Sequence, residues 1–207
     1  MIGILGAAVV GVGAWIAAGL WTKRGVEEPA FEVVSRDGEV EVRRYEPTVV
    51  AVTLVEGERE AALNEGFRRL AGYIFGKNRS KQEIAMTAPV SATRSEKIAM
   101  TAPVSATPAG PGIYRVTFTM PPGSTLESLP EPEDPRVVLE AVPARDLAAV
   151  RFSGWARTAA IEEHTALLVA WAERTGHELD GAPTLAQYDP PFTMPLLRRN
   201  EILVALR

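Results

Sequence analysis

The chain has 207 residues, of which 46% are hydrophobic and 23% charged, a composition typical of a globular domain with a buried core. Its formal net charge is −4, so no basic surface for a nucleic-acid backbone is expected and a DNA or RNA partner is excluded. Cysteine is absent, which excludes disulfides, thiolate metal ligands and cysteine nucleophiles.

The first predicted element is an uncharged stretch over residues 2–21. A helix of this length rises about 30 Å, the thickness of the hydrocarbon core of a bilayer. The stretch therefore predicts a single membrane anchor within residues 1–24, with Lys23 and Arg24 immediately after the span. These two cations favour a cytoplasmic position for the rest of the chain. A cleaved signal peptide is the alternative, but no basic residue precedes the apolar stretch.

A linker over residues 25–30 leads into alternating extended and helical patterns. β-rich runs, two of them separated by the hairpin-forming pair Asp37-Gly38, predict strands over 31–35, 39–45 and 48–55. The hydrophobic period then changes, and one apolar stripe indicates an amphipathic helix between Gly57 and Gly76. This stripe consists of Leu63, Phe67, Leu70, Ala71 and Ile74.

The second half of the chain repeats this order. Strands are predicted over 137–142 and 147–152, followed by a helix over 158–175 that Gly176 ends. Two strand-strand-helix units indicate an internal duplication, in which two helices cover a shared antiparallel sheet or open barrel. Further strands are expected over 113–120, 184–188 and 201–206.

A ten-residue sequence between the two halves occurs twice. Residues 84–93 recur without change as residues 98–107. Two copies joined by a short polar segment predict a hairpin-like excursion from the domain. Pro89 and Pro103 lack a backbone N–H, so both arms are expected at sheet edges or in irregular extended chain.

Four motifs, in order, resemble the SOUL haem-binding family from about Glu28 to Arg207. The motifs are Glu41–Tyr45, the helical stretch Leu63–Gly76, the repeated Ile-Ala-Met-Thr-Ala-Pro-Val, and Tyr188–Pro191 followed by Arg198–Glu201. The resemblance implies an α+β domain over residues 31–207. Its expected form is a distorted antiparallel β-barrel flanked by two helices, with two halves related by a pseudo-two-fold axis.

The resemblance also implies a shallow apolar groove that holds haem or another tetrapyrrole along the first helix. The groove would be lined by the apolar stripe of that helix, with Met86 and Met100 of the repeat near by. A flat macrocycle needs apolar walls for its faces and cations for its propionates, and Arg69, Lys77 or Arg79 can supply the cation. The alternative is that the stripe only seals the helix onto the sheet.

The chain departs from the family at a proposed iron ligand. In some animal members a histidine precedes the tyrosine of the first motif, whereas this chain has Arg44 there. His164 is the substitute candidate for a metal ligand, because at helical spacing it shares an apolar face with Ile161, Leu168 and Trp171. A hydrogen-bonded core histidine is the alternative interpretation of His164.

Other side chains carry groups that can ligate iron. Tyr45 and Tyr114 have a phenol, and Met86 and Met100 have a thioether. Packing is the alternative role for all four, since methionine fills irregular gaps in cores and grooves. His177 is interpreted as an exposed loop residue.

The leading hypothesis is a membrane-tethered protein that binds haem or a related flat hydrophobic ligand for transport, buffering or sensing. The sequence has no Gly-x-Ser-x-Gly elbow, no metal-binding histidine cluster and no phosphate-binding glycine loop, so an enzyme is not the favoured class. Two alternatives stay open. One is a small-molecule-converting enzyme on the same fold, and the other is a protein-interaction module that binds no haem.

Overall fold

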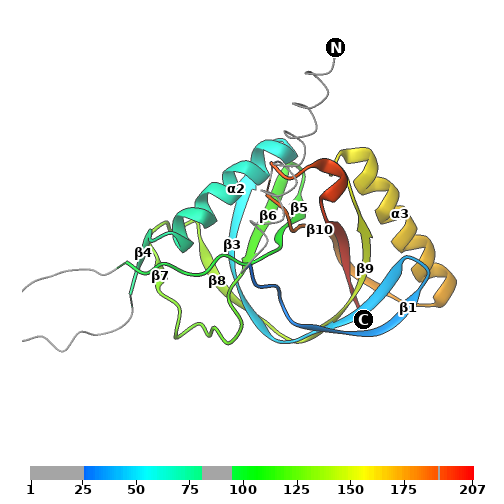
Figure 1. Ribbon diagram of the computed structural model, residues 1–207, viewed down its shortest axis with the longest axis horizontal. Helices are drawn as coiled ribbons and strands as arrows, with labels where there is room; N and C mark the ends of the chain where they lie inside the picture. The colour runs from blue at the N-terminus through cyan, green and yellow to red at the C-terminus, as the bar shows by residue number, and fades with distance from the viewer. Residues whose placement is uncertain (1–25, 81–94, 191) are drawn as a thin grey trace, which may run out of the picture.

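The computed structural model describes residues 26–80, 95–190 and 192–207, which form an antiparallel sheet with two helices (Figure 1). The predicted membrane anchor, residues 2–21, lies outside the described residues. Within the described ranges no helix is both long enough and apolar enough to cross a membrane.

The first half of the domain contains one helix, α2 (Arg59–Ile74). Its strands are β1 (Phe31–Asp37), β2 (Val40–Tyr45), β3 (Thr48–Glu56), β4 (Asn78–Arg79), β5 (Val104–Gly110) and β6 (Ile113–Thr119). The second half contains α3 (Thr158–Thr175) and a short 3₁₀ helix, η1 (Pro195–Leu197). Its strands are β7 (Glu131–Pro132), β8 (Val138–Val142), β9 (Arg145–Phe152), β10 (Leu179–Gln187) and β11 (Asn200–Leu206).

The main sheet has nine strands in the order β1-β2-β9-β11-β10-β5-β6-β3-β8. Without β1, the order consists of two matching halves. From the outside inward, one half is β2-β9-β11-β10 and the other is β8-β3-β6-β5. The topology therefore agrees with the internal duplication. The expectation of a closed barrel is wrong, because β1 and β8 are opposite edges of the sheet and do not pair with each other. Both edge strands expose most of their residues, so they end the sheet instead of closing it.

Both helices cover the same face of the curved sheet (Figure 1). Under α3 the core is formed by apolar side chains of β2, β9, β10 and β11 together with Leu168, Trp171 and Ala172. Under α2 it is formed by side chains of β3 and β6 together with Leu70, Tyr73 and Ile74. Because successive strand residues point to opposite faces, the other face of the sheet presents a separate set of side chains.

The repeated segment behaves differently from the expected hairpin at the sheet edge. Its first copy, residues 84–93, lies outside the described residues, but the second copy leads into β5, an interior strand between β10 and β6. Pro103 precedes the strand, where a missing N–H costs no ladder bond. Pro108 lies beyond the stretch of β5 that pairs with β10, which ends at Ala106. Pro103 is thus accommodated just before an interior strand and Pro108 beyond its pairing with β10.

Candidate functional site

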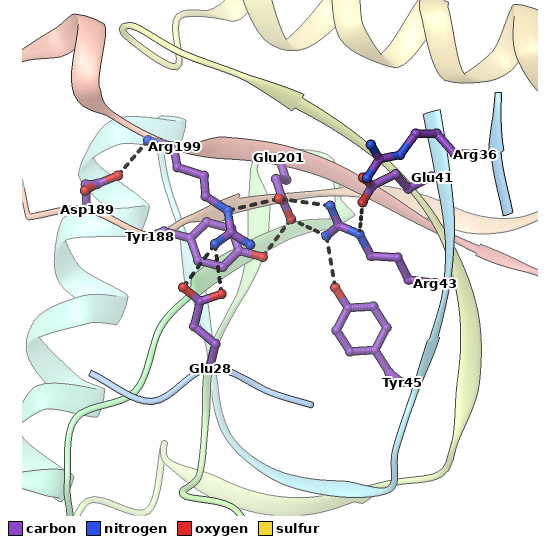
Figure 2. A network of polar contacts seen from close by, with 9 residues as sticks. All are labelled: Glu28, Arg36, Glu41, Arg43, Tyr45, Tyr188, Asp189, Arg199 and Glu201. Atoms are coloured by element: carbon purple, nitrogen blue, oxygen red, sulfur yellow. Dashed lines mark hydrogen bonds and ion pairs between the residues drawn. The ribbon is translucent and has the colours of Figure 1, made fainter. Parts of the chain in front are cut away.

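A cluster of charged and phenolic side chains lies on the sheet face that the helices leave uncovered (Figure 2). We call it the inner cluster; it comprises Arg43, Tyr45, Tyr188, Arg199 and Glu201. Glu201 is fully buried and is its centre. Arg43 donates from Nη1 to Glu201 Oε2 at 2.7 Å, the Tyr188 hydroxyl donates to the same oxygen at 2.7 Å, and Arg199 Nε donates to Oε1 at 3.0 Å.

The inner cluster continues to other segments of the chain. Arg199 donates from Nη1 to both carboxylate oxygens of Glu28, at 3.0 and 2.9 Å, and its guanidinium lies 3.7 Å from the ring centroid of Tyr188. Arg43 also donates to Glu41 at 2.7 Å. The predicted linker, residues 25–30, therefore contributes contacts to the domain through Glu28.

Strand alternation explains how these residues meet. Glu41, Arg43 and Tyr45 alternate along β2 with Val40 and Val42, which face the α3 core. On β11 Glu201 alternates in the same way with residues of that core. Two of the four family motifs thus contribute the opposite charges of one buried pair, a pairing that sequence reasoning missed. The available signal was Glu201, a charged residue in the otherwise uncharged strand β11.

The electrostatics of the inner cluster favour its charged state. Burial by itself raises the pKa of Glu201, but hydrogen bonds and positive charge from Arg43, then Tyr188 and Arg199, outweigh burial and hold that pKa below its usual value of 4.5. Burial, with the charge of Glu201, raises the pKa of Tyr188, so its hydroxyl stays protonated. Each charge named in this network faces an opposite charge. The network therefore ties β2, β11 and the N-terminal segment together and offers a ligand no unmatched charge.

The residues predicted to line a groove along α2 are only partly at the surface. Leu70 and Ile74 are buried against the sheet, at 0% and 1% exposure. Leu63 packs against the α3 core and Ala71 against the α2 core, so both are partly covered. Phe67 is 41% exposed, and its ring lies 5.4 Å from that of Phe118.

The polar and methionine components of the predicted groove are also dispersed. Arg69 donates to Glu65 at 2.8 Å, to Thr53 at 3.3 Å and to the carbonyl of Leu54 at 3.1 Å, so its guanidinium is already engaged. Met100 is 39% exposed, whereas Met86 lies outside the described residues. Phe67 and Met100 are thus the most exposed apolar side chains among the described residues predicted to line the groove.

His164 is partly buried, as its place on the apolar side of α3 predicted. Its ring stacks on Phe152 with centroids 4.4 Å apart, and Nδ1 lies 2.7 Å from the carbonyl oxygen of Ala160. A carbonyl only accepts, so Nδ1 carries the proton and Nε2 holds the lone pair. Both interpretations of His164, core residue and ligand, are compatible with this arrangement.

A surface cleft of about 490 Å³ is lined by residues of β1, β2, β9 and β11 and by His177, which follows α3. We call it the basic cleft, because Arg44, Arg145 and Arg207 line it, with Asp146 as its only lining carboxylate. Val34, Val42 and Leu206 give it an apolar wall, and His177 completes it. The prediction that His177 is exposed is confirmed, and His177 also lines this cleft.

The arginines of the basic cleft differ in their partners. Arg44 donates two hydrogen bonds to Asp146, both at 3.0 Å, and Arg207 lies 3.5 Å from Asp180. Arg145 has no ion pair with any acidic residue of the described part of the chain. Partial desolvation and then the positive charge of Arg115 lower the pKa of Arg145. Arg145 is opposite Tyr45 in the register of β2 and β9, so its side chain points to the face of the inner cluster, whereas Val42, Arg44 and Asp146 point to the other face.

No group of three or more histidine, aspartate or glutamate side chains among the described residues is arranged to hold a metal ion. A metal held by several protein ligands is therefore not indicated in that part of the chain. A metal that brings its own equatorial ligands, as a porphyrin does, needs only one or two axial donors.

The fold resembles solved structures that share little of its sequence. The C-terminal domain of EcmrR superimposes with a TM-score of 0.58 at 10% identity, over 86% of this chain and 98% of that domain. A hydrolase from Listeria innocua superimposes with a TM-score of 0.55 at 10% identity, over 84% of this chain and 94% of the hydrolase. At such identities the likeness defines a class of fold and no activity.

Residues 26–205 match the family described as SOUL heme-binding protein, and the chain belongs to this family. Two mammalian proteins named "Heme-binding protein 2" are similar to part of it. The mouse protein is 35% identical over 83 residues, which cover 35% of this chain and 40% of the mouse protein. The human protein is 36% identical over 72 residues, 32% of this chain and 35% of the human protein. The matches thus span well under half of either relative.

Proposed function

We propose that this protein binds haem or a related tetrapyrrole without a covalent bond, in transport, buffering or sensing and not in turnover. Family membership supports the ligand class. The observation that carries the proposal is the exposed ring of Phe67 on α2, the helix along which the resemblance places the groove. The alternative of an enzyme draws no support from the inner cluster, because its charges are already matched.

The basic cleft suits such a ligand less well. Its volume of about 490 Å³ falls in the range of small-molecule sites, roughly 300–1,000 Å³. However, Val42 is buried, Arg44 and Arg207 have acidic partners, and the side chain of Arg145 points to the other face of the sheet. When bound, haem would supply an iron centre for ligand or electron exchange; the protein residues would hold and orient it.

The groove along α2 is therefore the favoured location for the ligand. Phe67 is exposed on α2 and Met100 is exposed in the segment before β5, while Arg69 is held by other partners. The two locations differ in their anchor, an aromatic ring on α2 and the arginines of the basic cleft. Substitutions at Phe67 and Arg207 therefore distinguish them.

The test is a titration of haem and of iron-free protoporphyrin into the full-length protein in detergent, followed by the Soret absorption band. Phe67→Ala should weaken both ligands at least tenfold, because full burial of an aromatic side chain contributes about 1.5–3 kcal/mol. Arg68→Glu, at an exposed arginine of α2, is the matched control and should leave both affinities unchanged. Loss of binding through Arg207→Glu, with normal binding by a folded Phe67→Ala protein, would indicate the basic cleft instead. Absence of binding in the unsubstituted protein would contradict the function.

We further propose that residues 2–21 anchor the protein in a membrane, with the domain on the cytoplasmic side. Their uncharged composition and length support the anchor, and Lys23 and Arg24 support the orientation. Trp155, Phe192, Leu196 and Leu197 are exposed apolar side chains, and Arg199, two residues beyond Leu197, holds Glu28 near the start of the described chain.

A further inference from the structure

Four exposed hydrophobic side chains lie around the short helix η1, between the end of β9 and the start of β11. Leu196 and Leu197 belong to η1 and are 79% and 40% exposed. Trp155 and Phe192, at 52% and 50%, come from the segments beside it. We call these four side chains the η1 surface. Large hydrophobic side chains exposed together mark places where a protein meets another protein or a membrane.

Hydrogen bonds and a ring contact hold these segments next to one another. The N–H of Gly154 donates to the carbonyl of Pro195 at 2.9 Å, which places the loop after β9 against η1. Arg198 donates from Nε to the carbonyl of Thr193 at 2.8 Å, and its guanidinium lies 4.0 Å from the ring centroid of Trp155. One arginine thus joins both segments of the η1 surface.

Further arginines lie beside the η1 surface. In addition to Arg198, Arg157 is exposed in the loop after β9. Arg59, at the start of α2, donates to the carbonyl of Ala156 at 3.0 Å, so its guanidinium reaches the same loop. Asp189 is an acidic residue whose charge acts on Arg198. Aromatic and aliphatic side chains beside cations suit the boundary of a bilayer, where tryptophan lies at the level of the headgroups and arginine meets anionic lipid.

The start of the described chain keeps the η1 surface close to the predicted membrane anchor. Arg199, two residues beyond Leu197, donates to both carboxylate oxygens of Glu28. The seven residues from Thr22 to Glu28 reach at most about 25 Å when fully extended. A span over residues 2–21 would therefore hold this side of the domain within that distance of the bilayer. Lipid is thus the partner that the η1 surface meets at the highest effective concentration.

We propose that the η1 surface docks on the lipid bilayer and fixes the orientation of the domain relative to it. This docking rests on the proposed membrane anchor, which supplies the tether. The four apolar side chains enter the boundary between headgroups and acyl chains, and Arg157 and Arg198 contact anionic headgroups. The first turns of α2 and α3 then face the membrane, because Arg59 and Thr158 adjoin the same loop.

The depth of a spin label tests the docking in the full-length protein. Because the chain has no cysteine, one introduced cysteine carries the nitroxide at a chosen place. Leu196→Cys reports on the η1 surface, and Glu178→Cys, at a 73% exposed side chain beyond the other end of α3, is the control. Each protein is reconstituted in phosphatidylcholine vesicles with or without phosphatidylglycerol. Electron paramagnetic resonance then measures collisions of the label with oxygen and with a water-soluble nickel complex.

The two labels should differ in their depth. The label at position 196 should lie about 5–10 Å inside the bilayer boundary, whereas the label at position 178 should stay in water. Phosphatidylglycerol should increase the fraction of the label at position 196 that is in lipid, because it supplies headgroups of negative charge. An unchanged fraction would overturn the contact between the arginines and anionic headgroups.

A second pair of variants tests whether the apolar side chains hold the surface on lipid. Trp155→Asp, combined with Leu196→Cys, should move the label into water, because a carboxylate is disfavoured inside the bilayer boundary. Val138→Asp is the matched control, since Val138 on the edge strand β8 is also 52% exposed, and it should leave the label in lipid. Melting temperatures close to that of the unsubstituted protein establish that both variants are folded.

The outcomes separate the docking from the anchor. A label at position 196 that stays in water while the protein floats with the vesicles would overturn the docking and leave the anchor intact. Protein that does not float with the vesicles would overturn both. Spin–spin broadening between labels at position 196 would identify a second copy of the chain as the occupant and exclude lipid. A label that remains in lipid in the Trp155→Asp variant would also contradict the docking, since the apolar side chains would then not hold it.

Discussion

At the scale of single residues, the buried carboxylate of Glu201 has the largest expected effect on stability. Glu201→Gln keeps the shape of the side chain but removes the charge that faces Arg43 and Arg199. Arg43 keeps Glu41 and Arg199 keeps Glu28 as partners, so the free energy of unfolding should fall by the value of hydrogen bonds to a charged group, about 1.5–3 kcal/mol, in urea denaturation. Glu178→Gln removes an exposed ion pair, 4.0 Å from Arg207, and should change stability by under about 1 kcal/mol. Equal effects of the two substitutions would contradict a central role for Glu201.

The same residue predicts how stability depends on pH. The pKa of Glu201 in the folded protein is below its usual value of 4.5, so the unfolded chain binds the proton more readily than the folded protein. The stabilisation is therefore complete above about pH 4.5 and is lost as the pH falls through the lowered folded pKa. Denaturation measured from pH 7 to pH 3 should show a shallower acid loss for Glu201→Gln than for the unsubstituted protein. Parallel curves would show that other carboxylates dominate.

At the scale of elements, the contact between α2 and β6 depends on a glycine. A Cβ added at Gly66 would come within 2.6 Å of a methyl carbon of Val116, on a strand that cannot easily move. Although alanine favours a helix by about 1 kcal/mol, the clash should make Gly66→Ala destabilising by about 1–3 kcal/mol. Gly72→Ala on the same helix meets only the flexible end of Lys77, at 3.2 Å, and should be neutral or stabilising. Thermal unfolding of both variants tests this, and a stabilised Gly66→Ala protein would refute the close packing.

At the scale of the whole molecule, deletion of residues 1–22 should release a folded soluble domain that binds haem as the full chain does. Glu28, which Arg199 holds, is retained in that truncation, so no described contact of the domain is lost. Cell fractionation should place full-length protein with the membranes and the truncated protein in the soluble fraction. Full-length protein in the soluble fraction with an intact N-terminus would refute the anchor. An N-terminus trimmed near Gly19 would indicate a signal peptide.

The sequence was sufficient for most of the elements, because local spacing carries that information. The helix predicted over 158–175 is α3 residue for residue, and the hairpin at Asp37-Gly38 forms between β1 and β2. β5 was missed because Pro103 indicated a sheet edge or irregular chain for that arm. Whether the strand that follows Pro103 becomes interior depends on its pairing with β10, which local sequence does not record.

What the sequence determined by itself is the family, the order of elements and the duplicated halves, since periodicity and motif order are properties of neighbouring residues. Only the tertiary structure decided that the sheet stays open and that the cluster around Glu201 joins Arg43 from 158 residues away. It also decided that Arg145, His177 and Arg207 share one cleft. Such groupings depend on which strands become neighbours and in what register. Strand neighbours and register are determined by how whole sheet faces pack, so no single segment of the sequence specifies them.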